Sequence, residues 1–254
     1  MRKNLIAGNW KMNATHLETI QMVQKLSYRL DYADYQRVDV VLCPPFTALR
    51  SAQTVIESDH LQIRLGAQNV HWEDKGAYTG EIAPGMLAKL SVSYVIVGHS
   101  ERRELFGETD ADVNRKVKAV FAAEMTPILC VGETEEERES GVTEEKVGGQ
   151  VRAGLEALSG EQIAGLVVAY EPIWAIGTGR TASDDDAGSM AAFIRQTIAD
   201  VAGDASESTR ILYGGSMNPG NVAGLMAKRD IDGGLVGGAS LDPDTFASVI
   251  RYWV

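Results

Sequence analysis

Three ionisable side chains follow short apolar runs in this sequence and are the first candidates for chemistry. Glu171 comes directly after residues 166–170 (L-V-V-A-Y), His99 follows V-I-V-G, and Lys11 lies shortly after Leu5–Ala7. Burial at the end of an apolar run removes water from a carboxylate, which raises its pKa and strengthens it as a base. A histidine that begins a helical turn is disfavoured as the imidazolium and can act as a neutral hydrogen-bond donor.

Each of the three also has a purely structural interpretation. Glu171 could form an ion pair with an arginine or lysine at a neighbouring strand end, and His99 could be a buried histidine with satisfied hydrogen bonds. Most lysines are solvated at the surface, so Lys11 is a candidate only because of its place after a strand. Both interpretations remain open for the single residues.

Two glycine-rich turns indicate an anion site. Gly214-Gly215-Ser216 follows one apolar run, and Gly237-Gly238-Ala239-Ser240 follows the next. Glycines at strand ends let backbone N–H groups approach an anion, and a helix N-terminus adds favourable partial charge. Either pair alone is explained as a tight turn, but the two together at adjacent strand ends favour phosphate binding.

Eight short apolar runs would position these residues. They are continuous and mostly rich in Val, Ile and Leu, as in buried parallel strands. The runs are Leu5–Ala7, Val38–Leu42, Ile63–Ala67, Tyr94–Val97, Pro127–Val131, Leu166–Tyr170, Arg210–Tyr213 and Gly234–Val236. We place the third and the last partly by their position along the chain.

Helical stretches separate the strands. They are Thr15–Leu30, Thr47–Ile56, Pro84–Leu90, Asp110–Ala123, Glu144–Leu158, Asp184–Val201, Pro219–Ala227 and Pro243–Tyr252, with start signals at Ser183, Asn218 and Asp242. Eight strands, each followed by a helix, predict an α/β protein with a single (β/α)8 barrel spanning residues 1–254. An open doubly wound sheet is the alternative, but the first strand lacks the G-x-G-x-x-G turn of a dinucleotide fold.

Composition restricts the partners. The formal net charge of −11 argues against nucleic acid and anionic membranes. No apolar run approaches the ~20 residues that span a bilayer, and the N-terminus does not resemble a signal peptide. Cys43 and Cys130 form neither a disulfide scaffold nor a metal-binding pattern. We therefore expect a cytoplasmic protein without a metal site.

Five segments together resemble the triosephosphate isomerase family. They are N-W-K-M-N (9–13), V-G-H-S-E-R-R (97–103), A-Y-E-P-I-W-A-I-G-T-G (169–179), Y-G-G-S (213–216) and L-V-G-G-A-S-L (235–241). The match runs from the first strand to the last. The resemblance implies an isomerase of glycolysis and gluconeogenesis that interconverts dihydroxyacetone phosphate and D-glyceraldehyde 3-phosphate through an enediol(ate), without metal or organic cofactor.

The resemblance also implies residue roles. Glu171 would be the base that moves a proton between two substrate carbons, and His99 would polarise the carbonyl as a neutral imidazole. Lys11 and Asn9 would contact the substrate, with Glu101 positioning Lys11. Phosphate would be bound largely by backbone N–H groups of Gly177, Ser216, Gly237 and Gly238.

Two further segments carry expectations from the resemblance. Pro172, Ile173, Trp174, Ala175, Ile176, Gly177, Thr178 and Gly179 would form a lid whose apolar middle removes water from Glu171. The segment G-A-Y-T-G-E (76–81), with Tyr78, Thr79 and Gly80, resembles the loop through which the family forms homodimers. Arg180 and Met217 depart from the commoner lysine and valine without affecting the chemistry.

Two rival functions make different predictions. A Schiff-base aldolase requires a lysine on a mid-barrel strand, and none of the apolar runs contains one. A barrel kept only as a scaffold would have lost Lys11, His99 or Glu171, and all three are present.

Overall fold

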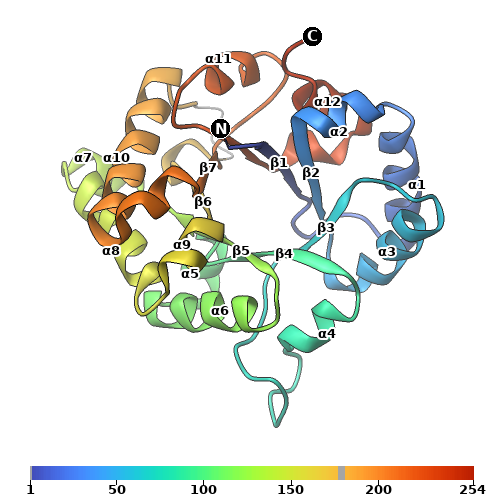
Figure 1. The fold of residues 1–254 in the computed structure, drawn as a ribbon, viewed down its shortest axis with the longest axis horizontal. Coiled ribbons are helices and arrows are strands. Elements are labelled where there is room, and N and C mark those ends of the chain that lie inside the picture. Colours follow the sequence, from blue (N-terminus) through green and yellow to red (C-terminus); the bar gives the residue numbers. More distant parts are fainter. Residues whose placement is uncertain (1, 177–180) are drawn as a thin grey trace.

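Eight parallel strands close into a barrel in the computed structural model, which describes residues 2–176 and 181–254 (Figure 1). The strands are β1 (Asn4–Asn9), β2 (Val38–Cys43), β3 (Arg64–Ala67), β4 (Val92–Val97), β5 (Thr126–Val131), β6 (Val167–Tyr170), β7 (Arg210–Tyr213) and β8 (Gly233–Val236). Each strand pairs with the next, and β1 pairs with β8. All eight predicted strands, and the (β/α)8 barrel itself, are confirmed.

Successive side chains along each strand point alternately into the barrel and toward the helices, which gives two apolar layers. Side chains such as Leu5, Val41, Ile128 and Leu212 pack in the barrel interior, and their neighbours in sequence pack against the surrounding helices. Both faces are thus buried, which explains why the strands read as continuous apolar runs. Cys43 and Cys130 belong to the interior cluster and are unpaired.

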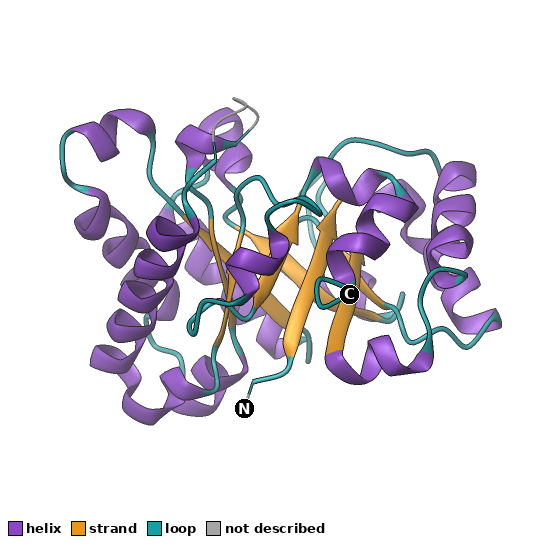
Figure 2. Ribbon diagram, turned by 90° about the horizontal axis from the view of Figure 1, so that it is seen from above, coloured by secondary structure: helices purple, strands orange, loops and turns teal. Residues whose placement is uncertain are grey.

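Helices surround the barrel (Figure 2). They are α1 (His16–Ser27), α2 (Tyr32–Arg37), α3 (Leu49–Ser58), α4 (Pro84–Ala88), α5 (Ser100–Phe106), α6 (Asp110–Ala122), α7 (Glu135–Glu139), α8 (Thr143–Leu155), α9 (Gly160–Gly165), α10 (Asp184–Ala202), α11 (Val222–Met226) and α12 (Pro243–Ile250). Short 3-10 turns lie at Phe46–Ala48, Ile173–Ala175, Gly203–Glu207 and Gly238–Leu241. Within the described ranges, no helix has the length and apolarity needed to cross a membrane.

Most predicted helices are confirmed with shifted ends. Ser183 and Asp242 cap α10 and α12 as expected, each accepting a backbone N–H three residues on. The start predicted at Pro219 is wrong, because the Asn218 side chain accepts the N–H of Gly220 and forms a local turn, so α11 begins only at Val222. Four short helices of the described chain, α2, α5, α7 and α9, were not among the predicted stretches, although α5 begins at the turn expected after His99.

Candidate active site

A cavity of about 360 Å³ lies at the C-terminal mouth of the barrel, the edge toward which all strand arrows point in Figure 2. It brings together most of the predicted site residues: Asn9, Lys11, His99, Glu171, Ser216, Gly237 and Gly238. Glu101 lies in the adjoining groove, which shares Asn9, Lys11 and His99 with the cavity. Gly177, Thr178 and Gly179 lie outside the described residues.

Glu171 is fixed at the end of β6 by its backbone and by two close glycines. Its N–H donates to the carbonyl of Val131 at 2.7 Å, which continues the β5–β6 ladder beyond the last strand residue. A Cβ on Gly132 would lie 1.8 Å from the Glu171 carbonyl oxygen, and one on Gly214 would lie 2.9 Å from Glu171 Cγ. The neighbouring strand ends therefore have to be glycine for the carboxylate to occupy this place.

The two oxygens of the Glu171 carboxylate have different surroundings. Oε2 accepts the backbone N–H of Ser100 at 2.9 Å. Oε1 lies 2.9 Å from Nε2 of His99 but has no well-aligned hydrogen-bond donor among the described residues, although the side chain is only 2% exposed. One oxygen is thus anchored, while the other is buried and has capacity to accept a proton.

The pKa of Glu171 is lowered in this arrangement, so the expected rise is wrong for this conformation. Burial acts to raise the pKa, but the neighbouring His99 and the N–H of Ser100 stabilise the carboxylate and outweigh it. The sequence indicated burial correctly, whereas the two stabilising groups come from a distant segment of the chain. Glu171 is therefore ionised at neutral pH, as a base has to be.

His99 begins α5 as its N-cap residue. Its Nδ1 accepts the N–H of Glu101 at 3.2 Å, and an acceptor nitrogen carries no proton. The neutral tautomer therefore has its proton on Nε2, on the side of Glu171. Burial acts to lower the pKa of His99, but the negative charges of Glu171 and Glu101 outweigh it. The net direction of the pKa is therefore upward, and the expectation that the imidazolium is disfavoured is wrong for this conformation.

Lys11 is held by a strained and tightly bonded loop. Its backbone has φ of +51°, which is uncommon for a residue with a side chain. Asn9 Oδ1 accepts the Lys11 N–H at 3.0 Å, and the side-chain amide of Gln68 donates to the Lys11 carbonyl at 2.8 Å. The ammonium lies 2.5 Å from Glu101 Oε1.

The two glycine turns border the same cavity as Glu171. A Cβ on Gly237 would lie 3.7 Å from Lys11 Cε, so this turn and the lysine face each other. A Cβ on Gly238 would have no atom of the described chain within 4 Å, so its backbone borders open space. Ser216 is exposed at the rim, and Gly215 packs against Tyr213 and Pro172. An anion can therefore approach backbone here, beside a positive charge.

Pro172–Ile176, the described part of the predicted lid, is packed against one buried carboxylate. Glu133 Oε1 accepts the Trp174 indole N–H at 2.8 Å and the Tyr170 hydroxyl at 3.0 Å. The Glu133 carbonyl also accepts the Ile173 N–H at 3.1 Å. Ile176 lines the cavity. Burial raises the pKa of Glu133.

Glu133 was missed in the sequence, although it occupies a strand end like the other candidates. It follows β5 in G-E-T, and the acidic run that comes next resembles a solvated surface segment. Its position after a strand was the available signal.

The fold is that of a (β/α)8-barrel enzyme, in which functional residues gather at the C-terminal mouth. The profile of the family "Triosephosphate isomerase" matches residues 4–253. Proteins named triosephosphate isomerase are 54% identical in Moorella thermoacetica, over 99% of both chains, and 52% identical in Streptomyces coelicolor, over 99% of this chain and 98% of the relative. A third from Clostridium tetani is 50% identical, over 99% of this chain and 97% of the relative.

The chain belongs to the triosephosphate isomerase family.

Proposed function

We propose that Glu171 is the catalytic base of this enzyme, which moves a proton between two carbons of the substrate. The enzyme interconverts dihydroxyacetone phosphate and D-glyceraldehyde 3-phosphate, a reaction of glycolysis. The observation that carries the role is the burial of the Glu171 carboxylate in the wall of the cavity, with Oε2 anchored by the Ser100 N–H and Oε1 2.9 Å from Nε2 of His99. A carboxylate in this state is ionised, shielded from water and open to a proton from carbon.

The base has to leave its present anchor to reach the substrate. In this conformation the Ser100 N–H holds Oε2 and helps to lower the pKa of Glu171. Moving the carboxylate away from both His99 and that N–H, into a cavity emptied of water, removes the groups that lower its pKa and leaves burial as the dominant influence. The pKa then rises toward that of the carbon acid, and proton transfer becomes more favourable.

His99 and Lys11 stabilise the charge that develops on oxygen. With Nδ1 occupied by the Glu101 N–H, His99 offers its Nε2–H to the substrate carbonyl. The Lys11 ammonium supplies a positive charge against the enediolate, and Glu101 fixes its position through the 2.5 Å contact. Asn9 orients the same loop by accepting the Lys11 N–H.

The glycine turns hold the phosphate at the other end of the cavity. Ser216, Gly237 and Gly238 border the open space there, with Lys11 Cε close to Gly237. Backbone N–H groups at such turns bind anions without a competing side-chain charge. Gly177 would add its N–H from the lid, so phosphate binding and lid closure would be coupled.

A coupled isomerase assay on the purified protein tests the function directly. We expect inorganic phosphate, added at constant ionic strength, to raise KM and leave kcat unchanged, because it occupies the glycine turns despite the acidic net charge. Phosphate that lowered kcat alone, or had no effect, would remove the assignment of the phosphate site.

We also propose that the chain acts as a homodimer. The segment between β3 and α4 projects beyond the ring of helices in Figure 1. Its base is stiffened by the His71 ring, which stacks near Trp72 and Tyr78 with centroid distances of 4.3 and 4.6 Å. Tyr78, Thr79 and Gly80 belong to this segment, and Tyr78 is 44% exposed.

A groove beside the active site offers a complementary surface. It is lined by the apolar side chains of Met12, Phe46, Leu105 and Phe106, and it shares Asn9, Lys11 and His99 with the catalytic cavity. Met12, Leu105 and Phe106 are all more than half exposed, which is a large apolar area for an isolated surface. Insertion of the partner's projecting loop would cover it and bring Thr79 of the partner subunit near Lys11.

Sedimentation of a charge variant tests the dimer. We expect the wild type to sediment at twice the chain mass and Phe106→Asp to sediment as a monomer with lower activity. Val201→Asp, at an exposed apolar position of α10, is the matched control and should remain dimeric. A monomeric wild type, or an unaffected Phe106→Asp, would contradict the proposal.

Residues 1–254 would form one catalytic domain in this account, since the strands of a single barrel span the chain from β1 to β8. We place its activity in the cytoplasm, where glycolysis runs and where two buried unpaired thiols such as Cys43 and Cys130 remain reduced.

A further inference from the structure

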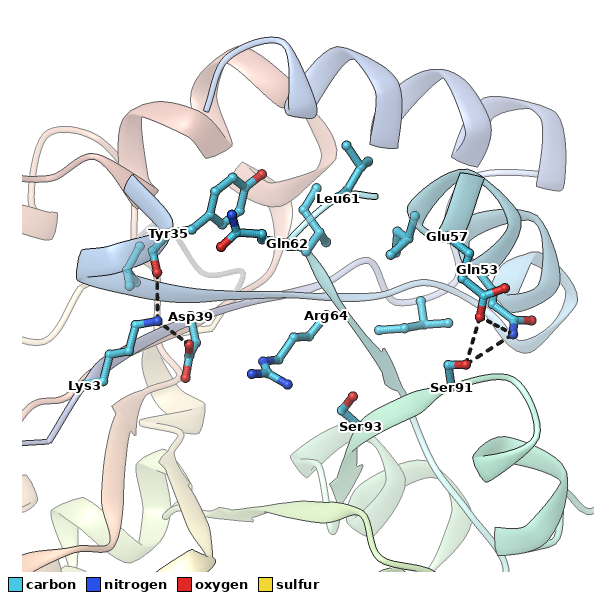
Figure 3. Close-up of a pocket in the computed structure, with 14 residues that line it drawn as sticks. Lys3, Tyr35, Asp39, Gln53, Glu57, Leu61, Gln62, Arg64, Ser91 and Ser93 are labelled. Atoms are coloured by element: carbon cyan, nitrogen blue, oxygen red, sulfur yellow. Dashed lines mark hydrogen bonds and ion pairs between the residues drawn. The ribbon is translucent and has the colours of Figure 1, made fainter. Parts of the chain in front are cut away.

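A second cavity, of about 350 Å³, opens at the N-terminal end of the barrel, opposite the candidate active site. Figure 3 shows its lining side chains, which come from the start of β1 to β4 and from α3. Arg64 is the first residue of β3, and Asp39 and Ser93 are the second residues of β2 and β4, so strand polarity places them at this end. None of these residues takes part in the proposed isomerisation.

Cations outnumber carboxylates on the barrel side of this cavity. The ammonium of Lys3 lies 2.8 Å from one oxygen of Asp39, and Arg210 Nη1 lies 3.0 Å from the other. Arg64 adds a third positive charge: it pairs with Val41 across the β2–β3 ladder, and Val41 lies two residues after Asp39 on the same face of the sheet. Asp39 thus already has two cationic partners, and Arg64 lies on the same face of the sheet as an additional positive charge, in a chain whose net charge is −11.

Arg64 is the group that is open to a ligand. Figure 3 shows its side chain reaching into the cavity, on the side of Asp39 and Ser93. Across residues 2–176 and 181–254 the structure gives Arg64 no hydrogen-bond or ion-pair partner, whereas Lys3 already donates to Asp39 and to the Tyr35 carbonyl at 2.7 Å. A guanidinium presents a planar fork of donors that binds carboxylate or phosphate in bidentate fashion.

The side chains on the other wall of the cavity, away from Arg64, limit which chemical group of a ligand can lie next to its anionic group. Ile56, Leu61 and Ile63 supply apolar surface. Beyond them Glu57 Oε1 accepts hydrogen bonds from Gln53 at 2.8 Å and from Ser91 at 2.9 Å, and these bonds lower the Glu57 pKa and keep it charged. This carboxylate repels a second anionic group at that end.

We propose that this cavity, which we call the floor site, binds a small molecule that carries one carboxylate or phosphate group next to an apolar part. The oxyanion lies against the Arg64 guanidinium and the Lys3 ammonium, and the apolar part lies on Ile56, Leu61 and Ile63. A volume of about 350 Å³ is within the range of small-molecule sites.

Calorimetric titration with phenyl phosphate and, separately, phenylacetate tests the floor site. Phenyl phosphate can also bind in the catalytic cavity, so its competition with substrate is measured by the isomerase assay on the same samples. The test variant is Arg64→Gln, and the matched control is Arg152→Gln, which removes an exposed arginine from α8. Because Arg64 has no partner within the described chain, its replacement should leave thermal unfolding unchanged.

We expect the wild type to bind at least one of the two probes at a site that does not compete with substrate. Arg64→Gln should weaken that site at least tenfold, in line with one lost charge-assisted pair, while kcat and KM stay at wild-type values. The probe that binds identifies the oxyanion. Absence of a non-competitive site for both probes, or equal weakening in Arg152→Gln, would overturn the proposal without affecting the isomerase assignment.

Discussion

Gly132 has no side chain, and the Glu171 backbone occupies the space where its Cβ would lie. Adding one methyl group at residue 132 therefore tests how strongly kcat depends on the position of the base. A Cβ at residue 132 would lie 1.8 Å from the Glu171 carbonyl oxygen, whereas ordinary contacts begin at 3.4 Å. Gly132→Ala therefore has to move the end of β6 by ~1.5 Å, at a cost of about 1–3 kcal/mol in the free energy of unfolding. A displacement of about 1 Å at a reacting group costs on the order of 10²-fold in rate. We expect kcat to fall by about that factor.

Two matched glycine variants calibrate the measurement. Gly149→Ala lies in α8 with no described atom within 4 Å of the new Cβ, and it should keep kcat and gain about 0.5–1 kcal/mol of stability. In Gly214→Ala the nearest atoms to the new Cβ would be Glu171 Cγ at 2.9 Å and the Tyr170 carbonyl oxygen at 3.0 Å, so we expect an intermediate loss of kcat. Urea unfolding and steady-state kinetics are measured on each. Wild-type kcat in a stable Gly132→Ala would refute the reasoning.

Three further predictions concern the lid and the ionisation of the base. Glu133→Ala removes the carboxylate oxygen that accepts the Trp174 indole N–H and the Tyr170 hydroxyl, and it should lower the free energy of unfolding in urea by about 2–4 kcal/mol. Glu133→Gln keeps an acceptor and should cost less than half of that. Equal costs for the two variants would contradict the hydrogen-bond account. Because the folded pKa of Glu171 is lowered, its ionisation stabilises the fold above the unfolded value near 4.5 and this contribution is lost as the pH falls through the folded value. The stability difference between wild type and Glu171→Gln should therefore be larger at pH 6 than at pH 3, and a constant difference would be inconsistent with the lowered pKa. Deletion of residues 173–178 should raise the methylglyoxal formed per triose phosphate isomerised, because water reaches the enediolate; an unchanged ratio would mean that the segment only packs.

The strands and most of the site were predictable because both depend on local pattern. Continuous apolar runs mark strands buried on both faces, and residues after the runs meet at one mouth of a closed barrel. That rule placed Lys11, His99 and Glu171 correctly in one cavity. It would also have found Glu133, had its acidic neighbours not suggested a solvated segment.

Features that depend on distant contacts could not be predicted. The lowered pKa of Glu171 comes from His99 and Ser100, about seventy residues away in the chain. The floor site depends on the register that sets Arg64 beside Val41, which no local pattern gives. The α11 boundary was wrong for a different reason: the Asn218 side chain bonds its own turn instead of capping a helix at Pro219.

Deuterium transfer in Glu171→Gln tests the central claim most directly. Wild-type enzyme acting on dihydroxyacetone phosphate in D2O should place deuterium at C2 of D-glyceraldehyde 3-phosphate, because the base exchanges its proton with solvent before returning it. The amide cannot accept the proton, so we predict a loss of both kcat and deuterium incorporation of at least ~10³-fold, in a variant that still unfolds cooperatively on heating. Deuterated product formed by Glu171→Gln at a rate near that of the wild type would contradict the assignment of Glu171 as the base.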